Sequence, residues 1–263
     1  MAKIDLDIEP HSGGAAIARV TIDNEARLNC LSSGLMEEFA GVIAALHDHP
    51  NLRAVVLTGA GDRAFVGGAD IDEMSAVRTP DQARAFIERV HGCCRAVRDL
   101  PVPVIARING YALGAGLELA AACDFRIAAE GAILGMPEVK LGIPSVVEAA
   151  LLPGLVGWGR ARRMLLLGET FRATEALGWG LIDEIAPPNG LDGAVSRATQ
   201  AVLETTPRAL SLQKALIRRW EELPMSQAIT AGIDAFADAW TTDEPVNAMA
   251  AYQAARQARK SGI

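Results

Sequence analysis

Residues 109–124, NGYALGAGLELAAACD, are the stretch of sequence that decides the fold. Gly114, Ala115 and Gly116 follow an apolar run typical of a buried strand, and Glu118 comes one turn into an expected helix. The first N–H groups of a helix have no partner inside it, and the helix dipole makes that end electropositive. An anion that forms there is stabilised, so we expect half of an oxyanion hole at this helix start.

A second segment rich in small residues, 65–74 (FVGGADIDEM), is the expected partner of the first. Gly67, Gly68 and Ala69 carry nothing larger than a methyl group, which leaves their backbone amides open to a ligand. Two amides directed at one carbonyl oxygen would stabilise the charge of an enolate. The two segments together therefore predict a complete oxyanion hole.

Two glutamates supply the expected acid and base. Glu118 is surrounded in sequence by leucine and alanine, and a carboxyl in so apolar a helix needs a partner or a function. Glu138 follows Pro137 and precedes a loop, so its side chain can face a cleft. Two carboxyls in one apolar site push their pKa values apart, leaving one acid and one base near neutral pH. This pattern favours proton chemistry beside an activated carbonyl.

Composition narrows the class of protein. The chain has 263 residues, half of them apolar and 22% charged, which is typical of a globular protein with an ample core. No apolar run reaches the roughly 18 residues that a membrane helix needs. The N-terminal MAKIDLDIEP has acids where a signal peptide is apolar. We therefore expect a cytoplasmic protein that does not bind membranes.

Charge and metal-binding residues exclude two further classes. The net charge is −7 with 25 basic residues, so we expect no broad basic face and no nucleic-acid partner. The four cysteines form no CxxC motif and no zinc spacing. His47 and His49 would diverge by about 200° on a helix, which is poor ligand geometry. No metal site is predicted.

Strand and helix patterns alternate along most of the chain. Short apolar runs at 53–57, 102–108 and 124–128 indicate buried strands, and 35–46 and 80–100 have helical spacing. This alternation favours a mainly parallel sheet with right-handed crossovers. After residue 145 the pattern is mostly helical. We predict an α/β catalytic core at 1–195 and a C-terminal helical region at 196–263.

Four motifs resemble those of the crotonase superfamily, the enoyl-CoA hydratase/isomerase family. They read RAFVGGADIDEM, PVPVIARINGYALGAGLELAAACDFRIAAE, GMPEVKLGIP and ATEALGWGLIDEI. The resemblance implies a spiral of ββα units with a C-terminal helical trimerisation region. It also implies a homotrimer, or a homohexamer built as a dimer of trimers. The substrate would be an acyl-CoA thioester, with no cofactor beyond the coenzyme A that the substrate carries.

The resemblance also assigns roles to individual residues. The oxyanion amides fall on Ala69 and Ala115, and the two catalytic glutamates of the hydratases fall on Glu118 and Glu138. Glu118 would help to activate a water for attack on the β-carbon, and Glu138 would deliver a proton to the α-carbon. The implied activity is an enoyl-CoA hydratase, which adds water across the 2,3 double bond. The expected substrate contacts are Ala26, Arg27, Leu28, Gly67, Gly68, Asp70, Ile71, Gly114 and Val146.

The chain departs from the family after the second glutamate. Hydratases usually read LGxxPGxGGTQRL there, whereas this chain reads LGIPSVVEAALLPGL, one residue shorter and without the paired glycines. Bulkier side chains at 145–148 should reshape the acyl site. Glu148 has two interpretations: an acid that complements a helix N-terminus, or an extra polar group in the pocket.

Several alternatives stay open at the level of sequence. A Δ3,Δ2-enoyl-CoA isomerase needs one base and no water, and the presence of both glutamates favours hydration. Another crotonase-type acyl-CoA enzyme is a further alternative. A Rossmann dehydrogenase dependent on NAD(P) is suggested weakly by VVLTGAGDRA after a strand, although FVGG follows where a helix should begin. A non-catalytic scaffold would not need both acids.

Overall fold

The computed structural model describes residues 2–260, in two compact units that divide after Gln200. No helix among these residues is long and apolar enough to cross a membrane. The assignment of the two units to a catalytic core and a trimerisation region stays a prediction.

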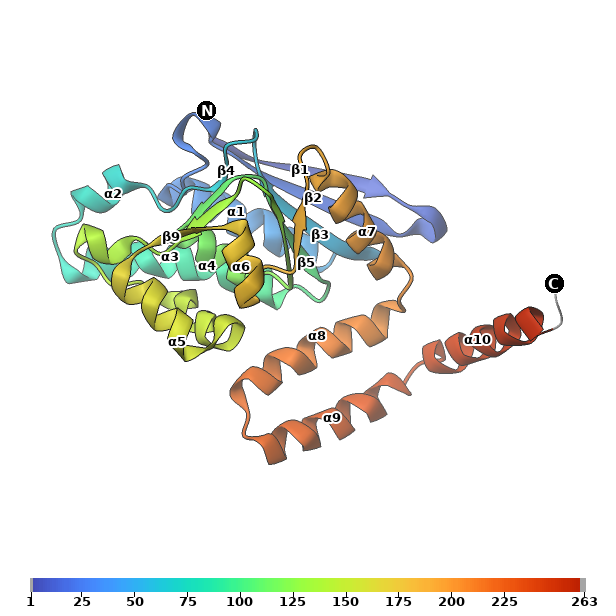
Figure 1. Ribbon diagram of the computed structural model, residues 1–263. Helices are drawn as coiled ribbons and strands as arrows, with labels where there is room; N and C mark the ends of the chain where they lie inside the picture. The colour runs from blue at the N-terminus through green and yellow to red at the C-terminus, as the bar shows by residue number, and fades with distance from the viewer. Residues whose placement is uncertain (1, 261–263) are drawn as a thin grey trace. The chain divides into compact units, whose positions relative to one another are not determined.

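The strands of the first unit form two sheets (Figure 1). In the larger sheet the order is β1 (Lys3–Pro10), β2 (Ala16–Asp23), β3 (Leu52–Gly59), β5 (Val104–Ile108), β7 (Phe125–Ala129) and β10 (Glu184–Ala186). In the smaller sheet the order is β4 (Ala64–Val66), β6 (Tyr111–Leu113), β8 (Ile133–Gly135) and β9 (Thr170–Arg172). All pairs are parallel except β1 with β2 and β8 with β9.

Helices connect these strands and make up the second unit. The α-helices of the first unit are α1 (Ser33–His47), α2 (Ile71–Ala76), α3 (Pro80–Asp99), α4 (Ala115–Ala122), α5 (Leu152–Leu167), α6 (Ala173–Trp179) and α7 (Leu191–Leu203), which runs across the division. Its 3₁₀ helices are η1 (Ser12–Gly14), η2 (Glu25–Arg27), η3 (Glu138–Leu141) and η4 (Val147–Leu151). The second unit contains α8 (Pro207–Glu222), α9 (Met225–Ala239) and α10 (Glu244–Lys260).

Local sequence explains where the helices near the site begin. Ser32 caps α1 by accepting a hydrogen bond from the N–H of Leu35, and Thr79 forms a capping box with Gln82 at the start of α3. Asp70 caps α2 in the same way. Each cap satisfies N–H groups that have no partner within the helix.

The mainly parallel arrangement expected from the sequence is confirmed, but the structure has a second sheet, in which β4, β6 and β9 lie outside the predicted strands. Strand β1 was not predicted, because its apolar residues alternate with acids and lysine at an exposed edge. The mostly helical pattern expected after residue 145 begins as the 3₁₀ helix η4, which is followed by α5, and Gly157 interrupts α5 with a φ of 78°. A residue with positive φ cannot continue an α-helix.

The parallel order of β4, β6 and β8 brings the predicted site residues together. The chain leaves each of these strands at its carboxyl end, and the carboxyl ends of parallel neighbours meet at one edge of the sheet. Residues 67–70 follow β4, residues 114–118 follow β6, and Glu138 follows β8. The smaller sheet therefore presents both amide segments and both glutamates at the same edge.

A fully buried asparagine holds the loop beside this edge. Asn29, with a φ of 57°, donates from Nδ2 to the carbonyls of Ala60 (3.0 Å) and Ala64 (2.8 Å), and its Oδ1 accepts from the N–H of Asn24 at 3.0 Å. Asn29→Ala leaves these buried groups unpaired, each at a cost of about 1–3 kcal/mol. We expect the free energy of unfolding in urea to fall by about 3 kcal/mol.

Asn51→Ala is the matched control for this substitution. Asn51 also has a positive φ, 64°, but is exposed. Its replacement should lower the unfolding free energy by only about 1 kcal/mol, the ordinary cost of a left-handed alanine. Equal losses in the two variants would mean that the buried hydrogen bonds of Asn29 contribute nothing.

Candidate active site

The two amide segments touch one another at the edge of the smaller sheet. A Cβ added to Gly116 would collide with the backbone carbonyl of Val66, so the first turn of α4 packs directly on the end of β4. A Cβ added to Gly68 would lie 3.4 Å from the carbonyl oxygen of Leu113. Gly116 therefore cannot gain a side chain without displacing Val66, whereas Gly68 is required by its φ of 126° and not by lack of space.

The N–H of Ala69 points away from its neighbouring strand. Leu31 donates its N–H to the carbonyl of Gly68 (2.9 Å) and accepts from the N–H of Asp70 (2.8 Å), forming a short parallel bridge on one side of the segment. Successive amides of an extended chain alternate in direction, so the N–H of Ala69 faces the opposite side. It has no acceptor among the described residues.

The N–H of Ala115 is available for a different reason. Ala115 is the first residue of α4, and the helix pattern provides no acceptor for that position. Hydrogen bonds within residues 2–260 leave this amide unused, whereas the N–H of Gly114 donates to the carbonyl of Gly135 at 2.9 Å. The structure thus provides two unused amides on adjoining segments, as the oxyanion-hole prediction requires.

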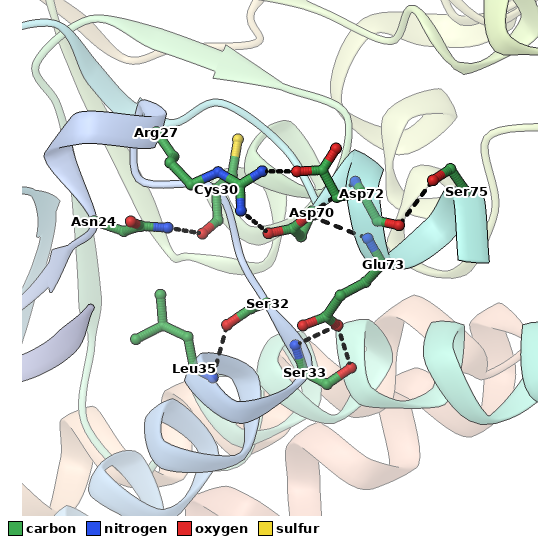
Figure 2. Close-up of polar contacts among 10 residues, drawn as sticks. All are labelled: Asn24, Arg27, Cys30, Ser32, Ser33, Leu35, Asp70, Asp72, Glu73 and Ser75. Carbon is green, nitrogen blue, oxygen red and sulfur yellow. Dashed lines mark hydrogen bonds and ion pairs between the residues drawn. The ribbon is translucent and has the colours of Figure 1, made fainter. Parts of the chain in front are cut away.

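An ion-pair cluster supports the first amide segment (Figure 2). Asp70 accepts from the N–H groups of Asp72 (2.9 Å) and Glu73 (3.2 Å), and its Oδ2 pairs with Arg27 at 2.9 Å. Arg27 also pairs with the carboxylate of Asp72. Figure 2 shows the guanidinium of Arg27 between the two carboxylates. Because Asp70 is buried, this contact fixes the residue that follows Ala69.

A second contact ties α2 to α1. The Glu73 carboxylate accepts from both the N–H (2.9 Å) and the hydroxyl (2.6 Å) of Ser33, as Figure 2 shows. Ser33 is the first residue of α1, so the carboxylate also satisfies a free N–H at a helix start. The segment that follows the Ala69 amide is therefore held by two sets of contacts, one at Asp70 and one at Glu73.

Glu118 lies in a nearly dry environment on α4. It is 3% exposed, and its Oε1 accepts from the N–H of Ala149 at 3.3 Å. Burial, and after it the nearby charge of Glu138, raises the pKa of Glu118 from its ordinary 4.5 to about 8. The carboxyl of Glu118 is therefore protonated at neutral pH when no substrate is bound.

Glu138 lies over the start of the same helix. A Cβ added to Gly114 would come within 2.5 Å of Glu138 Oε1, so the carboxyl passes directly beside Gly114. Its other oxygen, Oε2, accepts from the hydroxyl of Ser145 at 2.8 Å. Glu138 is half-buried, in contrast to Glu118. The two acids thus share one site but have different surroundings, which is the arrangement that separates an acid from a base.

The remaining predicted substrate contacts surround these groups. Leu28 accepts from the N–H of Gly67 at 2.8 Å, so the segment 26–28 lies against the first amide segment. Ile71, at the start of α2, is 58% exposed, and Val146 is exposed beside Ser145. The side chains of Arg27 and Asp70 bind each other here. Contact with a substrate stays a prediction for all nine of these residues. They are Ala26, Arg27, Leu28, Gly67, Gly68, Asp70, Ile71, Gly114 and Val146.

Sequence reasoning missed two residues that position this site. Asn29 follows the predicted segment 26–28 and carries the buried hydrogen bonds described above. Ser145 was noted only as part of an altered turn, although its hydroxyl binds Glu138. The sequence does place the Ser145 hydroxyl seven residues after Glu138, and this spacing could have indicated the contact.

The site is distinct from a cavity of about 330 Å³ elsewhere in the first unit. That cavity is lined by Lys140, Arg163, Met164, Glu169, Thr170, Phe171, Glu175 and Trp179. None of the predicted catalytic residues lines it. Within residues 2–260 there is no group of three or more His, Cys, Asp or Glu side chains that could hold a metal ion.

The raised pKa of Glu118 makes stability depend on pH. The folded protein keeps this proton up to about pH 8, while the unfolded chain loses it near pH 4.5. Because the folded state binds more protons in this window, the unfolding free energy should fall as pH rises through it. Glu118→Gln should be more stable than the parent at pH 8.5 by roughly 2–5 kcal/mol and nearly equal to it at about pH 4.

Urea unfolding at the two pH values measures this difference. The exposed Glu130, replaced by glutamine, is the control and should behave as the parent at both. If Glu118→Gln and the parent show the same pH dependence, Glu118 is ionised in the folded protein.

Comparison with known proteins gives the family. The sequence matches the family model described as "Enoyl-CoA hydratase/isomerase" over residues 12–260. The chain belongs to the enoyl-CoA hydratase/isomerase family. The resemblance seen in its four motifs, that of the crotonases, is therefore confirmed.

Individual crotonases are similar along nearly the whole chain. A short-chain-enoyl-CoA hydratase of Clostridium acetobutylicum is 35% identical, with 90% of each chain covered. A crotonyl-CoA hydratase of Syntrophomonas wolfei is 34% identical, covering 92% of this chain and 93% of its own. The crystal structure of an enoyl-CoA hydratase from Bacillus anthracis superposes with a TM-score of 0.89 at 32% identity, covering 95% and 96% of the two chains. The crotonase fold predicted from the sequence is thereby confirmed.

Proposed function

We propose that the protein is an enoyl-CoA hydratase that adds water across the 2,3 double bond of a 2-enoyl-CoA thioester. The observation that carries this proposal is the meeting of two unused amides and two glutamates at one edge of the smaller sheet. The similarity to relatives named as hydratases, at 34–35% identity, supports it.

The two amides act on the thioester. The N–H groups of Ala69 and Ala115 bind its carbonyl oxygen, which becomes negatively charged when a nucleophile adds to the β-carbon. Amides already held in place stabilise this enolate without reorganising, and each such donor lowers the barrier by roughly 3 kcal/mol. The contacts of Leu31 and Arg27 with this segment hold the Ala69 amide in position.

The two glutamates move the protons. Glu138 takes a proton from water as the oxygen attacks the β-carbon, and Glu118 delivers its proton to the α-carbon. After these two transfers Glu138 is protonated and Glu118 is ionised. One proton then passes from Glu138 to Glu118, which restores the starting state. The burial of Glu118 supports placing the resting proton there, and the Ser145 hydroxyl, which donates to Glu138 Oε2, holds that carboxyl in position. These roles are the reverse of those that the resemblance implies.

The isomerase and the Rossmann dehydrogenase explain the site less completely than a hydratase does. An isomerase needs one base and no water, so it leaves one of the two glutamates without a task. The Rossmann interpretation is wrong, because the chain after TGAG enters strand β4 and no helix begins there. Membership in the hydratase/isomerase family agrees with this result.

A direct assay tests the proposal. Crotonyl-CoA and a panel of longer, branched and aromatic 2-enoyl-CoAs are mixed with the protein, and the absorbance of the conjugated thioester is followed. We expect the absorbance to disappear for at least one of them. Conversion of a 3-enoyl-CoA to its conjugated isomer, with no activity on any 2-enoyl-CoA, would instead establish an isomerase.

Assembly and location are part of the same proposal. The second unit exposes many large apolar side chains, which supports a homotrimer or a dimer of trimers formed through the C-terminal helices. They include Ile217, Trp220, Met225, Ile229, Ile233, Phe236 and Trp240. We further propose that the protein is cytoplasmic and needs no cofactor beyond the coenzyme A of its substrate. Light scattering on the full chain tests the assembly, since a monomer would contradict it.

A further inference from the structure

One short turn contacts both glutamates. In the segment 145–149, the hydroxyl of Ser145 donates to Glu138 Oε2 at 2.8 Å, and the N–H of Ala149 donates to Glu118 Oε1 at 3.3 Å. This is the segment in which the sequence departs from the glycine-rich pattern of the hydratases. Whatever fixes this turn therefore fixes the surroundings of both acids.

Glu148 anchors the turn to α3. Its Oε1 lies 2.9 Å from Nδ1 of His91, and the residue is only 7% exposed. Val147, just before it, has a φ of 37°, a conformation that β-branched residues avoid unless their surroundings impose it. Neither earlier interpretation of Glu148 included His91. Glu148 does lie in the first turn of η4, and its hydrogen bond to His91 also joins it to α3.

The other oxygen of Glu148 is left without a partner. Glu148 Oε2 is buried and has no hydrogen-bond partner among the described residues. Burying such an atom costs stability, so its presence needs an explanation beyond packing. A buried carboxylate that few hydrogen bonds stabilise acts electrostatically on neighbouring groups. Glu118 is one of the groups on which the charge of Glu148 acts.

The groups around Glu118 and Glu148 limit what can titrate there. They are Cys123 just after the helix of Glu118, Glu138 on η3, and His91, Cys93 and Cys94 on α3. Burial raises the pKa of Cys93 to about 12 and that of Cys94 well above its ordinary value, so both thiols are neutral. The negative charge of Glu148 raises the pKa of Glu118, in addition to the larger effects of burial and Glu138.

We propose that Glu148, held by His91, is a positioning residue that fixes the turn 145–149 and, with it, the surroundings that decide which of the two acids holds the resting proton. It acts through Glu118 and touches no substrate. The inference rests on the proposed function, because it assigns the proton within that site. It explains why a carboxyl occupies a position where hydratases usually have glycine.

Glu148→Gln tests the charge separately from the anchor. The amide oxygen can still bind His91, while the negative charge is gone. With ¹³C-labelled glutamate carboxyls, the titration midpoint of Glu118 is read by NMR and assigned by its absence in Glu118→Gln. We expect the midpoint to fall by roughly 0.5–1 pH unit, and the corresponding limb of the kcat profile to move with it at unchanged KM. Glu88→Gln, on the exposed face of α3, is the matched control and should move neither.

A second variant protects the test against misfolding. Glu148→Met fills a similar volume without charge and should lower the Glu118 midpoint in the same way. An unchanged midpoint in a folded Glu148→Gln or Glu148→Met protein would overturn the inference. If the midpoint falls but no enoyl-CoA is hydrated, the proposed function fails while the electrostatic role of Glu148 stands.

Discussion

Glu118→Gln and Glu138→Gln should each lower kcat for hydration by about 10²–10⁴. Each acid has one proton transfer to perform, and glutamine can neither donate nor accept a proton at neutral pH. Glutamine at 118 keeps the volume and can still accept from the N–H of Ala149, so the loss reports chemistry and not packing. The rate is followed by the absorbance of the enoyl thioester under saturating substrate.

The double variant and a surface variant complete this test. Because the two acids serve one reaction, replacing both should cost little more than replacing one. Glu130→Gln, on the surface, should keep the parent rate. A fully active Glu118→Gln or Glu138→Gln would show that the reaction does not use both acids.

Gly114→Ala should lower kcat by about 10²–10³. The substitution removes no catalytic group, and it acts by moving the backbone and Glu138. Gly114 has φ 53° and ψ −123°, a conformation that alanine strongly disfavours. The added Cβ would also come within 2.5 Å of Glu138 Oε1. The substitution therefore displaces Glu138 and the neighbouring Ala115 amide together. Stopped-flow assays at saturating substrate separate the loss in kcat from any change in KM.

A second glycine provides the control for this effect. Gly131→Ala adds the same methyl group at a position where nothing lies within 4 Å of the new Cβ. It should retain kcat within about a factor of two, as expected of surface substitutions. If Gly114→Ala is folded and equally active, the Ala115 amide and Glu138 are not the groups that carry the reaction.

Sequence alone could predict which segments supply this site, but not the sheet that brings them together. Short apolar runs identified the parallel strands β3, β5 and β7 of the larger sheet, and small residues identified the amides of Ala69 and Ala115. The amide segments and Glu138 follow β4, β6 and β8 of the smaller sheet, which have three residues each and therefore show little periodicity. The alternating, half-charged β1 escaped notice because its pattern resembles a polar terminus.

Long-range polar contacts could not be predicted in this way. Arg27 and Asp70 are separated by 43 residues, and His91 and Glu148 by 57. No periodicity relates such pairs, since they meet only after the intervening helices have packed. The second of these contacts anchors the turn whose Ala149 N–H binds Glu118. The resemblance gave the acid role to Glu138, and the burial of Glu118, which supports the reverse assignment, is seen only in the folded structure.

The incorporation of solvent oxygen tests the central claim most directly. Crotonyl-CoA, or the 2-enoyl-CoA on which the protein is most active, is incubated in ¹⁸O-labelled water, and the product is analysed by mass spectrometry. The account predicts one labelled oxygen on the β-carbon, formed by the parent protein and lost in Glu118→Gln and Glu138→Gln. A product that carries no solvent oxygen on that carbon would contradict it.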